Sequence, residues 1–191
     1  MRNSVNITRG YQIMYMLGRT LFAAVLCLLT EIIVFVNFLD VETLRTIVGV
    51  IMIFVYGIIL YNGAANLGKF DAKPYTKLTP QLIRPVIWGG MIAAVAVVFL
   101  VLYRINWMML DKDGFPLAIS LVINCLFYFW NSPYLAFFIG NSNGYINPIV
   151  IAVMVVYPSV ACFIGYLAGS KNISLVDKFT VFMFEKPDSE E

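Results

Sequence analysis

The sequence predicts an all-α, polytopic helical integral membrane protein, with one membrane domain over residues 1–191. Hydrophobic residues make up 61% of the chain and charged residues only 13%, whereas soluble proteins average about 25% charged residues. Several apolar runs are about 20 residues or longer, which fits the ~30 Å hydrocarbon core of a bilayer. The basic residues lie at the ends of these runs, as expected for membrane-spanning helices.

About five transmembrane helices are expected. Each is apolar around most of its circumference, as lipid-facing helices are. The first can extend backwards through the amphipathic "YQIMYMLGR" at 11–19, and Pro85 lies in the first turn of the third, where a missing N–H is tolerated. The predicted spans cover approximately 20–39, 43–67, 82–105, 116–138 and 147–169.

The end of the fourth predicted helix is ambiguous. Pro133 interrupts it, so "SPYLAFFIGNSNGYINP" at 132–148 is a helix end, an interfacial loop or a shallow re-entrant hairpin. Its aromatic residues and lack of charge suit the headgroup boundary. After the fifth helix, Ser174 and Asp177 form a capping-box-like start. We therefore expect a short amphipathic interfacial helix and a tail within 170–191.

A basic turn between the second and third helices predicts the orientation of the chain. Short loops rich in Lys and Arg stay in the cytoplasm. The N-terminal segment and this turn together hold seven basic residues, against three on the opposite side, which favours a cytoplasmic N-terminus. Three lysines in the tail leave the C-terminal side open: either the tail lies outside, or a crossing between 117 and 148 is miscounted. The topogenic residues of the turn are Lys69, Lys73, Lys77 and Arg84.

Missing residue types argue against an enzyme. The chain contains no histidine, which excludes Ser-His and Cys-His hydrolases and histidine-ligated zinc or haem. GxSxG, phosphate-binding-loop and GxGxxG patterns are also absent. Cys27, Cys125 and Cys162 lie in three separate apolar runs, so we expect unpaired thiols and no metal site or cofactor. A net charge of +2 is too small to suggest nucleic acid.

Glu31 is the most specific candidate for a functional residue. It lies twelve residues into the first predicted span, near the middle of the bilayer, where an ionised acid costs a few kcal/mol. Thr20, Ala24, Cys27 and Glu31 share one helical face. This pattern fits a cation or proton site used in transport. It also fits a hydrogen-bonded helix-packing residue, or a helix register that leaves Glu31 nearer the interface.

The fourth predicted helix carries a second polar stripe. Side chains of this kind often only hydrogen-bond a neighbouring helix. If the two stripes face each other through Glu31 and Asn124, they enclose one polar site, whose cytoplasmic side two asparagines at the end of the second helix would close. The stripe comprises Ser120, Asn124, Tyr128 and Asn131, and the two closing residues are Asn62 and Asn66.

Small residues at four-residue spacing predict close helix packing. Such series serve packing within the chain or a docking face for a partner helix. Pro158, in the middle of the fifth predicted span, should kink that helix by freeing the carbonyl of Met154. The small-residue positions are Gly89, Gly90, Ala93, Ala94, Ala161, Gly165 and Gly169.

Two functions outside catalysis follow from these features. We expect a non-catalytic membrane protein that acts as an accessory, assembly or interaction subunit of a larger membrane complex. The alternative is a small-solute or ion transporter, or the substrate-binding membrane subunit of one. The expected partners are the lipid bilayer, other membrane subunits and, for the alternative, a small solute or cation. The segment "GYLAGSKNISLVDKF" at 165–179 resembles the endings of small multi-pass proteins of Gram-positive bacteria, which favours a bacterial plasma membrane.

Overall fold

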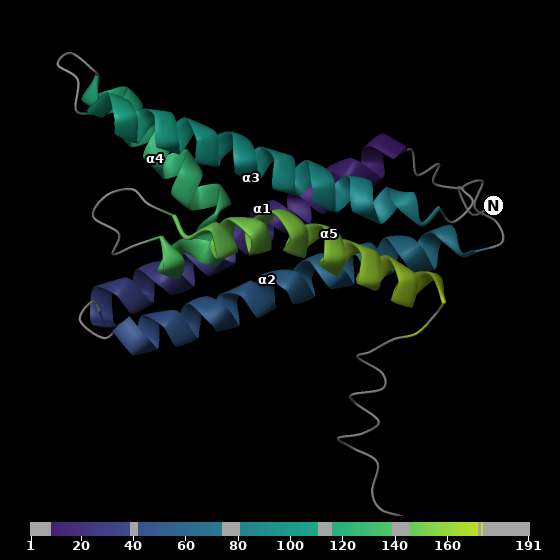
Figure 1. Cartoon of the computed structure of the whole chain (residues 1–191). Coiled ribbons are helices and arrows are strands. Elements are labelled where there is room, and N and C mark those ends of the chain that lie inside the picture. The colour runs from purple at the N-terminus through teal and green to yellow at the C-terminus, as the bar shows by residue number, and fades with distance from the viewer. Residues whose placement is uncertain are drawn as a thin grey trace, which may run out of the picture.

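Five α-helices and one short 3₁₀ helix make up the described part of the protein in a computed structural model (Figure 1). The structure describes residues 9–38, 42–73, 81–110, 116–138, 146–171 and 173, and these residues contain no strand. The predicted interfacial helix falls almost entirely outside them. The elements are α1 (Arg9–Phe38), α2 (Glu42–Asp71), α3 (Ile83–Leu110), α4 (Leu117–Trp130), η1 (Ser132–Phe137) and α5 (Pro148–Ser170).

Four of the helices are long and apolar enough to cross a bilayer. The all-helical membrane fold is therefore confirmed. α1 and α2 have 30 residues each, or roughly 45 Å of helix, and both extend well beyond the predicted spans. α4 has only 14 residues, about 21 Å, which is shorter than the hydrocarbon core. The spanning stretches are Gly10–Asn37, Thr43–Asp71, Ile83–Met109 and Pro148–Ser170.

The helix predicted over 116–138 is divided into two pieces that run in opposite directions. α4 runs back along α3 until the Trp130 indole donates to the Ile92 carbonyl at 3.4 Å. Pro133 then occupies the first turn of η1, because proline cannot continue the α-helical hydrogen bonds. η1 turns towards the beginning of α2, where Phe137 lies against Gly49. α4 and η1 therefore form a re-entrant hairpin within the bundle. The three possibilities that the sequence leaves open for 132–148 stay predictions, because residues 139–145 of that segment lie outside the described residues.

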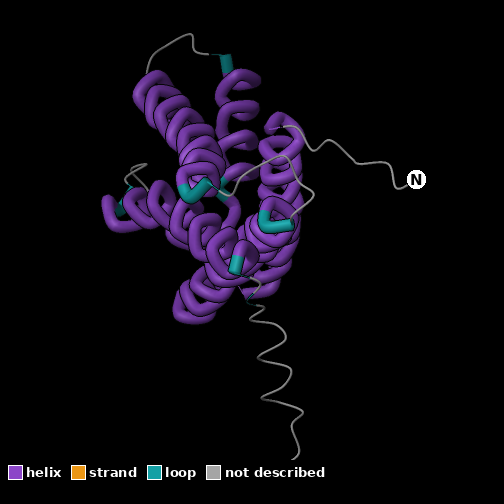
Figure 2. Tube along the Cα trace, turned by 90° about the vertical axis from the view of Figure 1, so that its right-hand side faces the viewer, coloured by secondary structure: helices purple, strands orange, loops and turns teal. Residues whose placement is uncertain are grey.

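Close packing between α2 and α5 determines how often the chain crosses the bundle. Gly165 lies against the backbone of Tyr61, and Gly169 lies against the backbone of Ala65 one turn later. The two helices therefore run parallel, and α3 is the single crossing between them. The end view in Figure 2 shows the helices foreshortened in one bundle, with only α-helical or 3₁₀ elements in its described part. Four crossings place the start of α1 and the end of α5 at the same end of the bundle.

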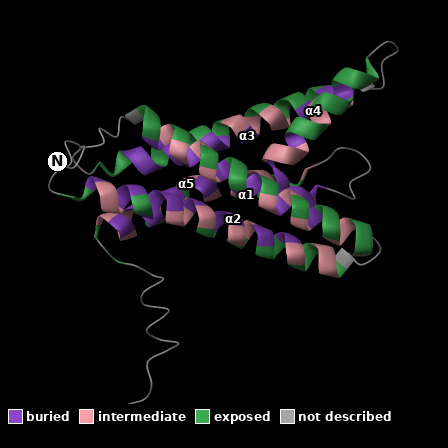
Figure 3. Ribbon diagram, turned by 180° about the vertical axis from the view of Figure 1, so that it is seen from behind, coloured by how far each residue is buried: buried purple, intermediate pink, exposed green. Residues whose placement is uncertain are grey.

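The core consists of two adjoining clusters of buried side chains. Buried and exposed residues alternate along the helices (Figure 3). The larger cluster joins α1, α2, α3 and α5 and includes Leu60, Trp88 and Tyr166. The smaller cluster joins α3, α4, η1 and α5, and its centre is Phe127, stacked on the Tyr103 ring at 4.2 Å. Exposed apolar side chains on every long helix are the surface that a bilayer requires.

Candidate functional site

The polar stripe of α1 is buried along its whole length. Thr20, Ala24, Cys27 and Glu31 are all 0% exposed. The stripe extends two turns further towards the N-terminus, to Gln12 and through Met16, because α1 begins eleven residues before the predicted span. Its neighbour is α2, whose Met52 carbonyl lies 3.8 Å from the Cys27 sulfur. The predicted small-and-polar face is thus a buried helix–helix contact.

Glu31 is buried without a hydrogen-bond partner. Neither carboxylate oxygen meets a donor within the part of the chain that the structure describes. Arg45 on α2 is the charged residue that acts electrostatically on Glu31, but its guanidinium lies over the Phe35 ring, 5.8 Å from the ring centroid. The Arg45 Nε is also buried without a partner. Glu31 of α1 and Arg45 of α2 therefore both keep buried hydrogen-bonding atoms without a partner among the described residues.

The re-entrant hairpin meets the same face of α1. The Ser132 hydroxyl, 0% exposed, donates to the Ala24 carbonyl at 2.7 Å. The neighbouring Asn131 donates from Nδ2 to the Phe127 carbonyl at 3.1 Å, while its Oδ1 meets no described donor. The Tyr134 hydroxyl is likewise buried and unpartnered among the described residues. The tip of the hairpin thus brings further unsatisfied polar atoms towards the helix that carries Glu31.

The rest of the predicted polar stripe on α4 bonds to α3 and does not bond to Glu31. The Asn106 amide donates to the Ser120 hydroxyl at 3.1 Å and to the Asn124 oxygen at 3.0 Å. Asn106 is 1% exposed and escaped the sequence analysis because it lies near the end of the third apolar run. The Tyr128 hydroxyl lies 3.4 Å from that of Tyr103. These contacts hold α4 against α3.

The two asparagines of α2 do not enclose a buried site, since Asn66 is exposed and Asn62 half-buried.

The small residues divide into two groups. One group is filled within the chain: a Cβ on Gly89 would lie 2.6 Å from the Ser159 nitrogen. The other faces outwards, since nothing lies within 4 Å of a Cβ on Gly90. Gly165, Gly169 and Ala93 are buried, Ala161 is half-buried, and Ala94 is exposed.

Pro158 is buried inside α5, against Gly89 of α3. Its carbonyl carbon would lie 2.9 Å from a Cβ on Gly89. α5 continues through Pro158 to Ser170, and the kink remains a prediction.

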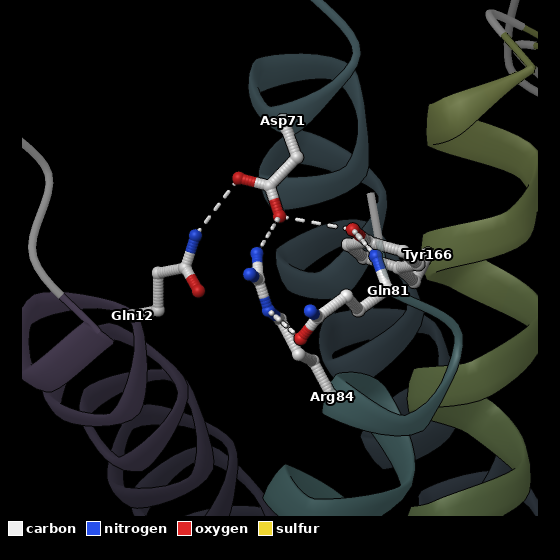
Figure 4. Close-up of polar contacts among 5 residues, drawn as sticks. All are labelled: Gln12, Asp71, Gln81, Arg84 and Tyr166. Carbon is white, nitrogen blue, oxygen red and sulfur yellow. Dashed lines mark hydrogen bonds and ion pairs between the residues drawn. The ribbon is translucent and has the colours of Figure 1, made fainter. Parts of the chain in front are cut away.

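A buried ion pair joins four helices at the end of the bundle where α1 begins and α5 ends, called the basic end below (Figure 4). The Arg84 Nη1 of α3 lies 3.2 Å from the Asp71 Oδ2 of α2. The same carboxylate accepts from the Gln12 amide of α1 at 2.9 Å and from the Tyr166 hydroxyl of α5 at 2.9 Å. Gln81 accepts from the Arg84 Nε at 3.1 Å and donates its backbone N–H to the Tyr166 oxygen at 3.3 Å. Asp71 therefore satisfies both of its oxygens.

Sequence analysis missed this network because the predicted second helix ends at 67. α2 continues to Asp71, and one further turn places this acid on the buried face of Leu60, Ala64 and Leu67 at intervals of four, three and four residues. An acid at the end of a buried stripe was the available signal.

The basic turn also differs from the expectation at one position. Arg84 is buried and paired with Asp71, so its charge is not offered to lipid headgroups. Lys69 is half-buried and Lys73 exposed. The ammonium of Lys73 lies 6.0 Å from the Phe70 ring centroid. Lys77 lies outside the described residues.

One small cavity lies among the described residues. That cavity lies between α1 and α3, measures about 10 Å³ and is lined by apolar side chains such as Ile13, Trp88 and Ile92, so it has roughly the space of one water molecule. Among the described residues, no three Cys, Asp or Glu side chains come together as metal ligands would. No known protein family, curated protein or solved structure matches the chain.

Proposed function

We propose that the protein is a non-catalytic subunit of a larger membrane complex. The observation that supports this most is the arm formed by α4 and the second half of α3, which diverges from α1 and α2 in Figures 1 and 3. Asn106, Ser120 and Asn124 hold the two helices of the arm together. Both helices nevertheless expose apolar side chains, including Val101, Leu121 and Val122.

Membrane helices associate through close packing because lipid tails are as apolar as their side chains. A rigid two-helix arm offers such a packing surface to the transmembrane helix of another chain. Gly90 and Ala94 on α3 face outwards and form a second surface. Because both residues are small, the backbone of a partner helix can approach closely there. The occupant that these surfaces fit is an apolar helix of a partner subunit.

Site-specific photo-crosslinking in native membranes tests this proposal. A photoreactive residue replaces Leu121 on the arm, which is 65% exposed, or Phe54 on α2, which is 62% exposed and serves as the matched control. We expect one discrete protein adduct from Leu121 and only lipid adducts from Phe54. Lipid adducts alone at both positions would contradict a partner on the arm.

A small-ion or solute carrier is the second candidate function. It is favoured by the re-entrant hairpin, because non-helical backbone at membrane depth is tolerated only inside protein or beside a water-filled cavity. Transporter sites often lie at such interrupted helices. Uptake into proteoliposomes with Glu31→Gln separates the candidates: a carrier loses ion-coupled uptake while the chain still assembles, whereas unchanged uptake removes Glu31 from any transport step.

For the orientation, we infer that the basic end faces the cytoplasm of a bacterial plasma membrane. Arg19, Lys69, Lys73 and Lys171 lie in the half of the bundle that contains the start of α1 and the end of α5, against Arg45 and Arg104 in the other half. Each basic residue near an anionic surface contributes about 1 kcal/mol. With four crossings, the end of α5 shares the cytoplasmic side with the start of α1.

A further inference from the structure

Glu31 differs from Asp71, the acid of the buried ion pair. Asp71 has an ion pair and two further hydrogen bonds, whereas both oxygens of Glu31 lack a described donor although the side chain is 0% exposed. Burying an ionised carboxylate without partners costs several kcal/mol, so such a group holds a proton. The contrast makes Glu31 the acid whose burial favours the protonated form.

The neighbours of Glu31 provide for the ionised form as well. α1 packs against α2, η1, α4 and α3. Arg45 of α2 is the cation whose charge acts on Glu31. The buried Cys27 thiol lies one turn away on the same face of α1, and the buried Tyr134 hydroxyl of η1 has no described partner. Since the buried Nε of Arg45 has no partner among the described residues, Arg45 is available to neutralise a Glu31 carboxylate.

We propose that Glu31 is a reversible proton-binding site within the membrane, with Arg45 as the counter-ion of its deprotonated form. On release, the O–H bond of the carboxylic acid breaks and the proton passes to water. The carboxylate that remains then pairs with the guanidinium of Arg45, which leaves the Phe35 ring. This site goes beyond the proposed subunit role, because a subunit needs no exchangeable proton.

The chemistry around Glu31 favours a proton over a metal cation. Ca²⁺ takes six to eight oxygen ligands. Two backbone carbonyls of the same region already accept contacts, that of Ala24 from Ser132 and that of Met52 from Cys27. No group of three acidic or cysteine ligands exists among the described residues. Binding a proton, in contrast, requires only the single carboxyl group of Glu31.

Infrared spectroscopy of the purified protein in lipid tests the proposal without relying on activity. The carbonyl stretch of a neutral carboxylic acid differs from that of a carboxylate, and Glu31→Gln removes the Glu31 band. We expect a neutral-acid band at low pH that vanishes reversibly as the pH rises and is absent from Glu31→Gln. If that variant fails to fold, Glu31→Asp keeps the carboxyl group and, with ¹³C-labelled glutamate, removes the Glu31 band from the labelled set, which distinguishes it from the other four glutamates of the chain.

Arg45→Gln tests the counter-ion. Loss of an opposite charge disfavours the carboxylate, so half-deprotonation should move upwards by about one to three pH units. A neutral-acid band that persists at every pH would show a permanently protonated packing residue and overturn the proposal. Absence of the band at every pH would show a permanent carboxylate and overturn it as well. A titration that shifts with sodium but not with choline would replace the proton by a cation site.

Discussion

Two adjacent glycines of α3 allow a matched test of the helix packing. A methyl group on Gly89 would lie 2.6 Å from the Ser159 nitrogen and 2.9 Å from the Pro158 carbonyl carbon, and would also meet the Ser159 Cα. Ordinary contact begins near 3.4 Å, so α3 and α5 must separate by about 0.8 Å. Both neighbours are backbone atoms, which cannot move aside as a side chain would. Overpacking of this kind costs about 1–3 kcal/mol.

Gly90→Ala introduces the same methyl group into the same helix, where nothing lies within 4 Å. The higher helix propensity of alanine gives between no change and about 1 kcal/mol of stabilisation there. We therefore expect Gly89→Ala to lower the free energy of unfolding in detergent and Gly90→Ala to leave it equal or higher. Unfolding monitored by circular dichroism against added denaturing detergent measures both. Equal stabilities for the two variants would refute the packing of α3 against α5.

Three further substitutions test the polar contacts. Asp71→Ala leaves the Arg84 guanidinium buried without a counter-ion and should lower the free energy of unfolding by about 3–5 kcal/mol. Adding Arg84→Gln should restore most of this loss in thermal unfolding. No effect of Asp71→Ala alone would contradict the network. Asn106→Leu removes both bonds to α4 and should cost about 1–2 kcal/mol, whereas Asn66→Leu at an exposed position should cost nothing. Ser132→Ala removes the bond to Ala24 and should cost about 1 kcal/mol; unchanged stability would argue against the seating of η1 on α1.

The fold could largely be predicted from the sequence because hydrocarbon thickness sets helix length and apolarity. The face of α1 that contains Cys27 and Glu31 was predictable from helical periodicity. The reversal after Trp130 could be predicted only in part. A proline after an apolar run predicts a break, but the direction of the following residues depends on contacts with α1 and α2.

The partners of the polar residues could not be predicted for a similar reason. Periodicity assigns a residue to a face of its own helix, and it leaves the facing helix open. Periodicity therefore allowed Asn124 to face Glu31, whereas its observed partner is Asn106. The predicted end of the second helix lay one turn before Asp71. Asp71 and Arg84 were therefore assigned to a solvent-exposed turn and not to a buried ion pair.

Cysteine accessibility at Lys171 tests the central claim, that four crossings place both ends of the bundle on the cytoplasmic side. Lys171 follows α5 directly and is exposed. It is replaced by cysteine in a chain from which Cys27, Cys125 and Cys162 have been removed. A membrane-impermeant thiol reagent should label this position only after the cells are permeabilised. Labelling in intact cells would place the end of α5 outside and contradict the four-crossing topology.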